Sequence, residues 1–256
     1  MPTAPVSQQE LAPRPDTTAC PRGGFQLNLA RSSLRGVETK EFIFAEGDPI
    51  SHVYLVEAGA VALYKVLADG RRQIVGFAYP GDFIGLGALG AHGEHLMNAQ
   101  AIKPTRLRCL PVTLLRQCAS RDPLIGLQLY EALAGELAAT RDLMLTIGRR
   151  SAMERVAGFL LAFSRRNQLN GQDRSSFELP MTRADIADFL GLTIETVSRT
   201  FTKLKMLGLI DLPRSDHIKL VDIRELESLA DGEEQDCWGQ SKKWRKRRRT
   251  VGQHGR

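Results

Sequence analysis

The chain has 256 residues, 43% of them apolar, which is enough to build one large or two ordinary packed domains. No apolar run approaches the roughly 18 residues that a membrane span needs. Residues 1–24 also lack the apolar stretch of a signal peptide. We therefore expect a cytoplasmic protein with no membrane partner.

The net charge of +6 comes from one end of the chain. Residues 241–256 carry eight basic side chains and no acid, and without them the rest of the chain is near −2. The charge therefore says nothing about the folded body, and any argument for nucleic-acid binding must rest on a local motif.

Four cysteines are too widely spaced for a zinc site or a compact disulfide framework. Cys20, Cys109, Cys118 and Cys237 lie 89, 9 and 119 positions apart. We expect reduced thiols, although Cys118 near a dimer helix is a candidate for an intersubunit bridge under oxidation.

Residues 1–24 hold five prolines among small and polar residues and are expected to form a disordered arm. From residue 25 to about residue 118, short apolar runs alternate with turn signals at 46–49, 58–59, 69–70 and 80–82. Regularly spaced short strands predict an antiparallel barrel or β-roll.

The periodicity changes at Asp122-Pro123, where a capping side chain precedes a proline at the first helical position. Residues 119–150 are therefore expected to contain one long helix. Apolar positions recur along it at heptad spacing, and they predict a dimerisation seam of Tyr130, Leu133, Leu137, Thr140, Met144 and Ile147. The alternative is a helix that packs against its own barrel; Thr140 weakens the seam.

A helix-turn-helix is predicted at about residues 182–206, inside a third region that spans residues 151–230. Thr182 caps the first helix, which ends at Gly191, and Thr193 caps the second, which is expected to reach Leu207. Small and apolar side chains at spacings typical of this motif point inward: Ile186, Ala187, Leu190, Ile194, Val197, Phe201 and Leu204.

The opposite face of the second helix gathers Glu195, Ser198, Arg199 and Thr202 within about a quarter of its circumference. In a DNA major groove, arginine suits the paired acceptors of guanine, and glutamate suits the amino group of cytosine. The alternative is a solvated polar face with Glu195 and Arg199 as a helical ion pair. We favour base reading because the turn and the following segment agree with it.

That segment, residues 208–221, reads as two short strands around a turn at 213–216, which is the wing of a winged helix. A capping pattern at Asp222 and Glu225 predicts one more short helix. Phosphate contacts are expected from Arg183, Thr193, Thr196 and Arg214.

Residues 25–229 resemble the CRP/FNR family of bacterial transcription regulators, most closely its FixK-type members. The resemblance is strongest over residues 179–210, which contain Glu195-Thr196-Val197-Ser198-Arg199, and it extends to Pro80-Gly81-Asp82-Phe83-Ile84-Gly85 in the barrel. It implies an α+β architecture: an N-terminal antiparallel β-roll like that of cyclic-nucleotide-binding domains, a long dimerisation helix and a C-terminal winged helix-turn-helix.

By this resemblance, Glu195, Ser198 and Arg199 are the base-reading residues, and the site is a palindrome of the TTGA-N6-TCAA type. The resemblance also implies a homodimer on double-stranded DNA and contact with RNA polymerase, with the loop at Leu67 to Arg71 as a candidate surface. Half-sites one helical turn apart suit a two-fold dimer.

The chain departs from the family's ligand-binding patterns. Its N-terminal arm has only Cys20, and the barrel position of the family's cluster-binding cysteine is Arg108, one residue before Cys109. Gly85-Leu86 and His95-Leu96-Met97 stand where a Gly-Glu and an Arg-Ser would hold a cyclic nucleotide. His92, Glu94 and His95 are weak candidates for metal or haem ligands. We expect no cofactor.

The sequence thus predicts a DNA-binding transcription regulator, a homodimeric activator that needs no obligate cofactor. The alternative is a β-roll that senses a ligand or haem and needs it for DNA binding. No nucleophile elbow, phosphate loop or metal-binding helix suggests an enzyme. The basic tail, residues 231–256, is expected to add weak electrostatic affinity for DNA or to have no role.

Overall fold

The structure is a computed structural model that describes residues 32–90 and 93–232. The predictions for the arm at 1–24, for Cys20, His92 and Cys237, and for nearly all of the basic tail lie outside the described residues. Two compact units are present: one contains residues 32–66 and 75–143, and the other contains residues 67–74 and 144–232.

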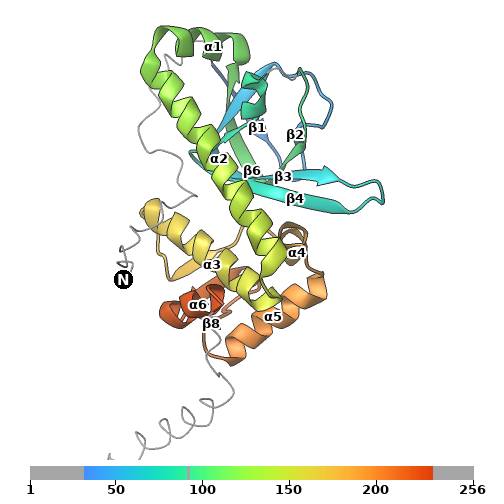
Figure 1. Cartoon of the computed structure of the whole chain (residues 1–256), viewed down its shortest axis with the longest axis vertical. Helices are drawn as coiled ribbons and strands as arrows, with labels where there is room; N and C mark the ends of the chain where they lie inside the picture. The colour runs from blue at the N-terminus through green and yellow to red at the C-terminus, as the bar shows by residue number, and fades with distance from the viewer. Residues whose placement is uncertain (1–31, 91–92, 233–256) are drawn as a thin grey trace, which may run out of the picture. The chain divides into compact units, whose positions relative to one another are not determined.

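The first unit is built on a six-stranded sheet with the order β1-β6-β3-β4, in which β2 pairs with β6 and β5 with β3 (Figure 1). The long strands β3 (His52–Val66) and β6 (Asn98–Pro111) form its centre, and their register joins Val53 to Leu110 and Tyr64 to Asn98. The shorter strands are β1 (Ser33–Val37), β2 (Phe42–Phe44), β4 (Arg72–Ala78) and β5 (Phe83–Ile84). This is the antiparallel β-roll that the strand pattern predicted.

Turns form at three of the four predicted signals, 46–49, 69–70 and 80–82. Gly70 (φ 83°) lies between β3 and β4, and Gly81 (φ 95°) precedes β5; glycine adopts these left-handed conformations without steric cost. The signal at Ala58-Gly59 was wrong as a turn, because Gly59 lies inside β3, where the register with β6 shifts. There a Cβ would stand 2.4 Å from the Pro104 carbonyl oxygen, so this glycine allows a bulge and a close strand approach.

Two helices follow the strands. Helix α1 (Val112–Arg121) begins within the range in which we had expected only strands. Its Leu115 is fully buried in a cluster with Val53 and Leu110, which explains why an apolar run that resembles a strand is helical here. Asp122 ends α1, and its carboxylate accepts a hydrogen bond from the Leu124 N–H (2.9 Å), so α2 (Pro123–Arg149) begins where predicted.

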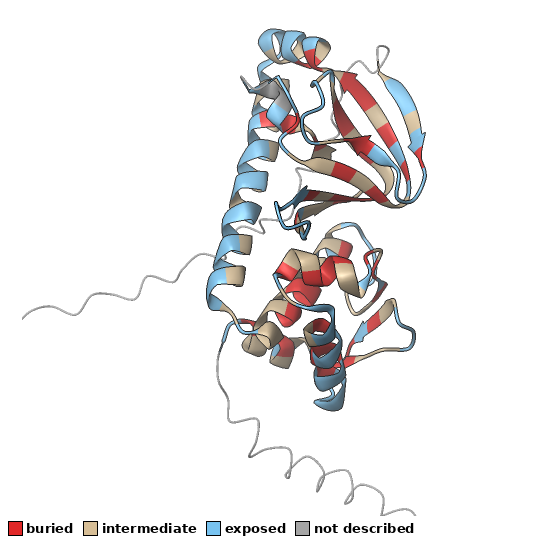
Figure 2. Cartoon of the chain, turned by 90° about the vertical axis from the view of Figure 1, so that its right-hand side faces the viewer, coloured by how far each residue is buried: buried red, intermediate tan, exposed pale blue. Residues whose placement is uncertain are grey.

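Helix α2 packs on the β-roll along one face only. Leu129 is buried, and Ile125 and Ala132 lie against the same cluster as Leu115. These three residues recur at helical spacing, so they lie on one face of the first half of α2, and that face packs on the β-roll. The rest of α2 is largely exposed (Figure 2).

The second unit combines four helices with a three-stranded sheet. Helix α3 (Ala152–Leu169) packs against α5 (Ile194–Met206) and α6 (Ile223–Ala230), and α4 (Arg183–Leu190) packs against α5. Strands β8 (Ile210–Asp211) and β9 (His217–Leu220) form the predicted wing. The core contains Val156, Leu160, Ile186, Leu190, Val197, Phe201, Leu204, Ile210, Ile218 and Leu226.

A further strand completes the sheet of this unit, and a side-chain cap starts its last helix. Strand β7 (Ser176–Glu178), which the sequence pattern did not predict, pairs with β9. At Asp222 the carboxylate accepts from the Glu225 N–H (3.0 Å), which gives the predicted helix start.

Candidate nucleic-acid interface

Local hydrogen bonds determine the turn between α4 and α5. Thr182 and Asp185 form a reciprocal capping box at the start of α4, as predicted. Gly191 ends α4 in a left-handed conformation (φ 63°), and the Thr193 hydroxyl accepts from the Thr196 N–H (3.2 Å) to start α5. Only two residues separate the end of one helix from the cap of the next, so this turn fixes the direction in which α5 leaves α4.

Buried side chains hold the two helices together. Ile186, Ala187 and Leu190 from α4, and Val197, Phe201 and Leu204 from α5, are at most 2% exposed. Ile194, which we had placed on the inner face, is 49% exposed instead. It occupies the first position of α5, where no preceding turn covers it.

The outer face of α5 is polar and exposed. Glu195, Ser198, Arg199 and Thr202 all lie on the surface, as the helical spacing predicts. The Thr202 hydroxyl donates to the Ser198 carbonyl (3.1 Å), so it is partly occupied by its own helix. Glu195, Ser198 and Arg199 therefore present a carboxylate, a hydroxyl and a guanidinium to an approaching molecule.

Glu195 is held as an anion. Its own backbone N–H and the Thr193 hydroxyl donate hydrogen bonds that lower the pKa of the carboxyl, and the positive charge of Arg199 lowers that pKa further. The carboxylate is therefore an acceptor at neutral pH, while Arg199 is a donor. Together they match the two kinds of polar group on a base pair.

Arg183 joins α4, α5 and the wing. Its guanidinium carbon lies 3.4 Å from the centroid of the Phe201 ring, and its Nη2 donates to the Ser215 carbonyl (3.1 Å). Burial lowers the pKa of Arg183 to about 10, so it stays protonated at neutral pH. One of the N–H groups of Arg183 is therefore already bonded to the wing, through the Ser215 carbonyl.

The other predicted phosphate-binding residues lie around the same surface. The hydroxyls of Thr193 and Thr196 are 3.0 Å apart at the start of α5. Arg214 is exposed in the wing turn, with its Nε 3.8 Å from an Asp216 carboxylate oxygen. The structure thus places all four predicted phosphate-binding residues on this unit, at the first turns of α4 and α5 and on the wing.

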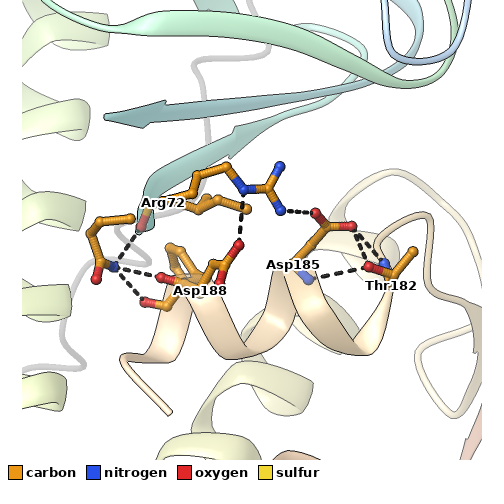
Figure 3. A network of polar contacts seen from close by, with 7 residues as sticks. Arg72, Thr182, Asp185 and Asp188 are labelled. Carbon is orange, nitrogen blue, oxygen red and sulfur yellow. Dashed lines mark hydrogen bonds and ion pairs between the residues drawn. The ribbon is translucent and has the colours of Figure 1, made fainter. Parts of the chain in front are cut away.

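An ion-pair network on α4 was not predicted from the sequence. Within the second unit, Arg72 Nε donates to Asp188 (2.8 Å) and Arg72 Nη2 donates to Asp185 (2.5 Å), which also caps α4 through Thr182 (Figure 3). Gln73 Nε2 donates to the Asp188 carbonyl oxygen (2.7 Å). The pairing spans more than 110 positions in sequence, so local patterns cannot reveal it.

The face of α2 that carries the predicted seam is uncovered. Tyr130 is 68% exposed, Leu137 51% and Met144 70%; Leu133 and Thr140 are also exposed, and Ile147 is half-buried. Thr140 donates to the Glu136 carbonyl (2.8 Å), which satisfies its hydroxyl within the helix. A row of large apolar side chains on one face of a helix is typical of a protein contact surface.

Comparison with known proteins agrees with both halves of this description. Residues 34–122 match the cyclic nucleotide-binding domain, and residues 154–229 match the Crp-like helix-turn-helix domain. The nitrogen fixation regulation protein FixK of Bradyrhizobium diazoefficiens is 38% identical over 84% of this chain and 95% of its own length. The chain belongs to the CRP/FNR family of transcription regulators.

Other CRP/FNR proteins are similarly close. The transcriptional activatory protein AadR of Rhodopseudomonas palustris is 42% identical over 75% of this chain and 78% of its own length. The structure of FixK2 from Bradyrhizobium japonicum has a TM-score of 0.72 and 39% identity, and it covers 77% of this chain and 96% of that one. This confirms the predicted α+β architecture, and membership of a family of transcription regulators means that the chain is not an enzyme.

His95, Leu86 and Gly85 in the β-roll are closely packed against other side chains. His95 is 5% exposed and its ring stacks on Phe44, with centroids 3.7 Å apart and planes 7° from parallel. Leu86 is buried in the cluster around Leu115, and a Cβ on Gly85 would lie 3.3 Å from His95 Cε1. Of the residues that the resemblance sets in place of charged nucleotide contacts, Leu86 and His95 are therefore buried.

Arg108 and Cys109 point to opposite sides of β6, as the strand alternation predicted. Cys109 belongs to the β-roll core, where burial raises the pKa of its thiol, whereas Arg108 pairs with Glu57 through its guanidinium. Among residues 32–90 and 93–232, no three His, Cys, Asp or Glu side chains come together as metal ligands. No helix in that part of the chain is long and apolar enough to cross a membrane.

Proposed function

We propose that this protein is a transcriptional activator that binds, as a homodimer, a DNA palindrome of the TTGA-N6-TCAA type. The observation that carries the proposal is the trio Glu195, Ser198 and Arg199. All three are exposed on the outer face of α5, while the inner face of α5 is buried in the helix-turn-helix core. The names of its relatives agree, since AadR is described as a transcriptional activatory protein.

Base reading follows from the chemistry of the trio. Arg199 donates to the N7 and O6 acceptors of guanine, and Glu195 accepts from the amino group of cytosine. One G·C pair in each TTGA half-site presents both groups. Ser198 lies on the same face of the helix, beside Glu195, and contacts a neighbouring base.

Phosphate contacts orient the domain on the duplex. The groups are Arg183, Thr193, Thr196 and Arg214, which surround the N-terminal end of α5 and the wing. Because Arg183 already holds the wing through Ser215, it contacts phosphate through its remaining N–H groups, and the wing moves with it.

The dimer forms through the seam of α2. Its six residues are Tyr130, Leu133, Leu137, Thr140, Met144 and Ile147. Burial of such large side chains against the same row of a second copy offsets the cost of association, and a two-fold axis along α2 presents two recognition helices to the palindrome. We also propose that the hairpin tip at Leu67 to Arg71, where Arg71 is strongly exposed, contacts RNA polymerase.

A second candidate is a β-roll regulator that binds DNA only with a ligand or haem. It is favoured by the match of residues 34–122 to the cyclic nucleotide-binding domain. The packed His95 and Phe44 rings argue against a nucleotide in that place. Titration calorimetry with cyclic nucleotides and an absorption spectrum of the purified protein separate the two candidates, since a stoichiometric Soret band would indicate haem.

Fluorescence anisotropy with short labelled duplexes tests base reading. We expect tight, salt-sensitive binding to TTGA-N6-TCAA and weak binding to a scrambled duplex. Arg199→Ala should cost about 1–3 kcal/mol per half-site and remove the preference at the G·C pair, while affinity for scrambled DNA is spared. Arg224→Ala, an exposed arginine on α6, is the control for loss of charge. Equal affinity of the wild type for both duplexes refutes the proposal.

Light scattering tests the seam. Leu137→Glu places a charge in the centre of the exposed row and should give a monomer whose affinity for the palindrome falls to that for a single half-site. Glu131→Gln, which changes an exposed residue outside the row, should leave the dimer intact. A dimer that survives Leu137→Glu unchanged places the interface elsewhere.

A further inference from the structure

One side chain joins the last turn of α2 to the turn of the helix-turn-helix. Arg155, on α3, donates from Nη2 to the Ile147 carbonyl (2.6 Å), from Nε to the Arg150 carbonyl (2.8 Å) and from Nη1 to the Leu190 carbonyl (3.0 Å). A longer contact of 3.5 Å reaches the Gly191 carbonyl. All these residues belong to the second unit.

Two of these carbonyls, those of Ile147 and Leu190, are ones that the helices themselves leave without partners. Helix α2 ends at Arg149 and α4 ends at Leu190, and the last four carbonyls of an α-helix have no N–H within the helix to accept from. A guanidinium at the negative ends of two helices is also favoured by both helix dipoles. Arg155 therefore binds two helix ends at once, with its N–H groups directed by a planar fork.

The hydrogen bonds of Arg155 lie close to the start of α5, the helix proposed to read DNA. Gly191, at the C-cap of α4, lies beside the last turn of α2, since a Cβ on it would lie 3.5 Å from Ile147 Cγ2. Thr193 then caps α5 only two residues later. A change in the angle between the end of α2 and the end of α4 would consequently rotate α5 and its outer face.

We propose that Arg155 is a positioning residue that sets the spacing of the two half-sites which the dimer reads. The inference rests on the proposed function, because it requires a dimer through α2 and a palindromic site. In such a dimer the two-fold axis runs along α2, so the direction of each α5 depends on the angle between the end of α2 and the end of α4. The hydrogen bonds of Arg155 hold that angle. Arg155 contacts no base and adds nothing to the reading of a single half-site.

Spacer length is the property to measure. Anisotropy titrations would use TTGA-N5-TCAA, TTGA-N6-TCAA, TTGA-N7-TCAA and a duplex with one TTGA half-site. We expect the wild type to prefer the six-base-pair spacer by about tenfold or more, because half-sites must face the same side of the duplex. In Arg155→Met this preference should shrink to about twofold, with affinity for the single half-site unchanged.

Two further variants separate positioning from loss of charge or of folding. Arg149→Met removes an exposed charge two residues beyond Ile147 and should keep the full preference. Arg155→Lys keeps the charge but, as a point donor, cannot span carbonyls of both helices, so it should also lose the preference. It provides the test if Arg155→Met does not fold.

The possible outcomes distinguish this inference from the proposed function. If the wild type does not prefer TTGA-N6-TCAA over scrambled DNA, the proposed function fails. If the wild type shows the spacer preference and folded Arg155→Met or Arg155→Lys retains it in full, Arg155 does not position the recognition helices and the inference is overturned.

Discussion

The outer face of α5 and the interior of the β-roll differ in the side chains that they offer to a binding partner. On α5, Glu195 and Arg199 are exposed charged groups on a rigid helix, directed away from the protein core. In the β-roll, His95 and Phe44 fill the interior by stacking, and Leu86 is buried. The contrast supports the proposal that α5 reads DNA, and it argues against a nucleotide beside His95.

The largest effect is expected from removing the charged groups of α5. The double variant Glu195→Ala and Arg199→Ala should bind the palindrome no better than scrambled DNA, a loss of about a thousandfold or more. Far-ultraviolet circular dichroism should be unchanged, because both side chains are exposed. Retained specificity in a duplex competition assay would mean that other residues read the bases.

A methyl group inside the β-roll should act on stability instead. Gly85 has φ 79°, and its Cβ would stand 3.3 Å from His95 Cε1, so Gly85→Ala should lower the free energy of unfolding by about 1–3 kcal/mol in urea titrations. DNA affinity of the folded fraction should not change. Gly87→Ala, where a Cβ meets no atom within 4 Å, should have an effect below about 0.5 kcal/mol. Equal effects of the two would show that the space around His95 is not tightly packed.

The ion pairs on α4 should contribute less to the free energy of unfolding than the packing around Gly85. Arg72 is 27% exposed, and its partners Asp185 and Asp188 are 11% and 31% exposed, so Arg72→Gln should cost about 1–2 kcal/mol, discounted for solvent screening. Hydrogen exchange of the α4 amides should increase. The neighbouring Arg71→Gln, whose pair with Asp69 is exposed, is the control and should change stability little. An unchanged exchange rate on α4 in Arg72→Gln would contradict a stabilising network.

The smallest effect is a pH dependence of the β-roll. Burial lowers the pKa of His95 below its ordinary value of 6.5, against a weaker opposing effect of Asp48. Below pH 6.5 the unfolded chain therefore binds a proton that the folded chain does not. Stability contributed by neutral His95 is present above that pH and decreases as the pH falls toward the lowered pKa.

His95→Phe keeps an aromatic ring on Phe44 and removes the titrating group. Urea titrations between pH 5 and 7.5 should show a shallower slope of stability with pH for this variant than for the wild type. Identical slopes would show that His95 titrates alike in the folded and unfolded chain.

Local chemistry explains what could be predicted from the sequence. The caps at Thr182 and Thr193, the glycine at 191 and the helix start at Asp122 involve residues within four positions of one another, so their patterns are visible in a short window. The outer face of α5 follows from helical periodicity alone. Its exposure required no knowledge of the rest of the chain.

Contacts distant in sequence could not be predicted in this way. The bulge at Gly59 depends on the approach of Pro104, and helix α1 depends on a buried place for Leu115. The bonds of Arg72 to α4 and of Arg155 to Leu190 join segments that no periodic pattern relates. At α1 and Gly59, tertiary contacts overrode the local preference for a strand or a turn. The hydrogen bonds of Arg72 and Arg155 leave no local pattern in the sequence.

DNA footprinting with purified protein and no added ligand tests whether the dimer reads a palindrome without a cofactor. We expect a protected region that is symmetric about TTGA-N6-TCAA, is unchanged when a cyclic nucleotide is added, and is lost in the double variant of Glu195 and Arg199. Protection that appears only after a nucleotide is added, or that shows no two-fold symmetry, would contradict this expectation.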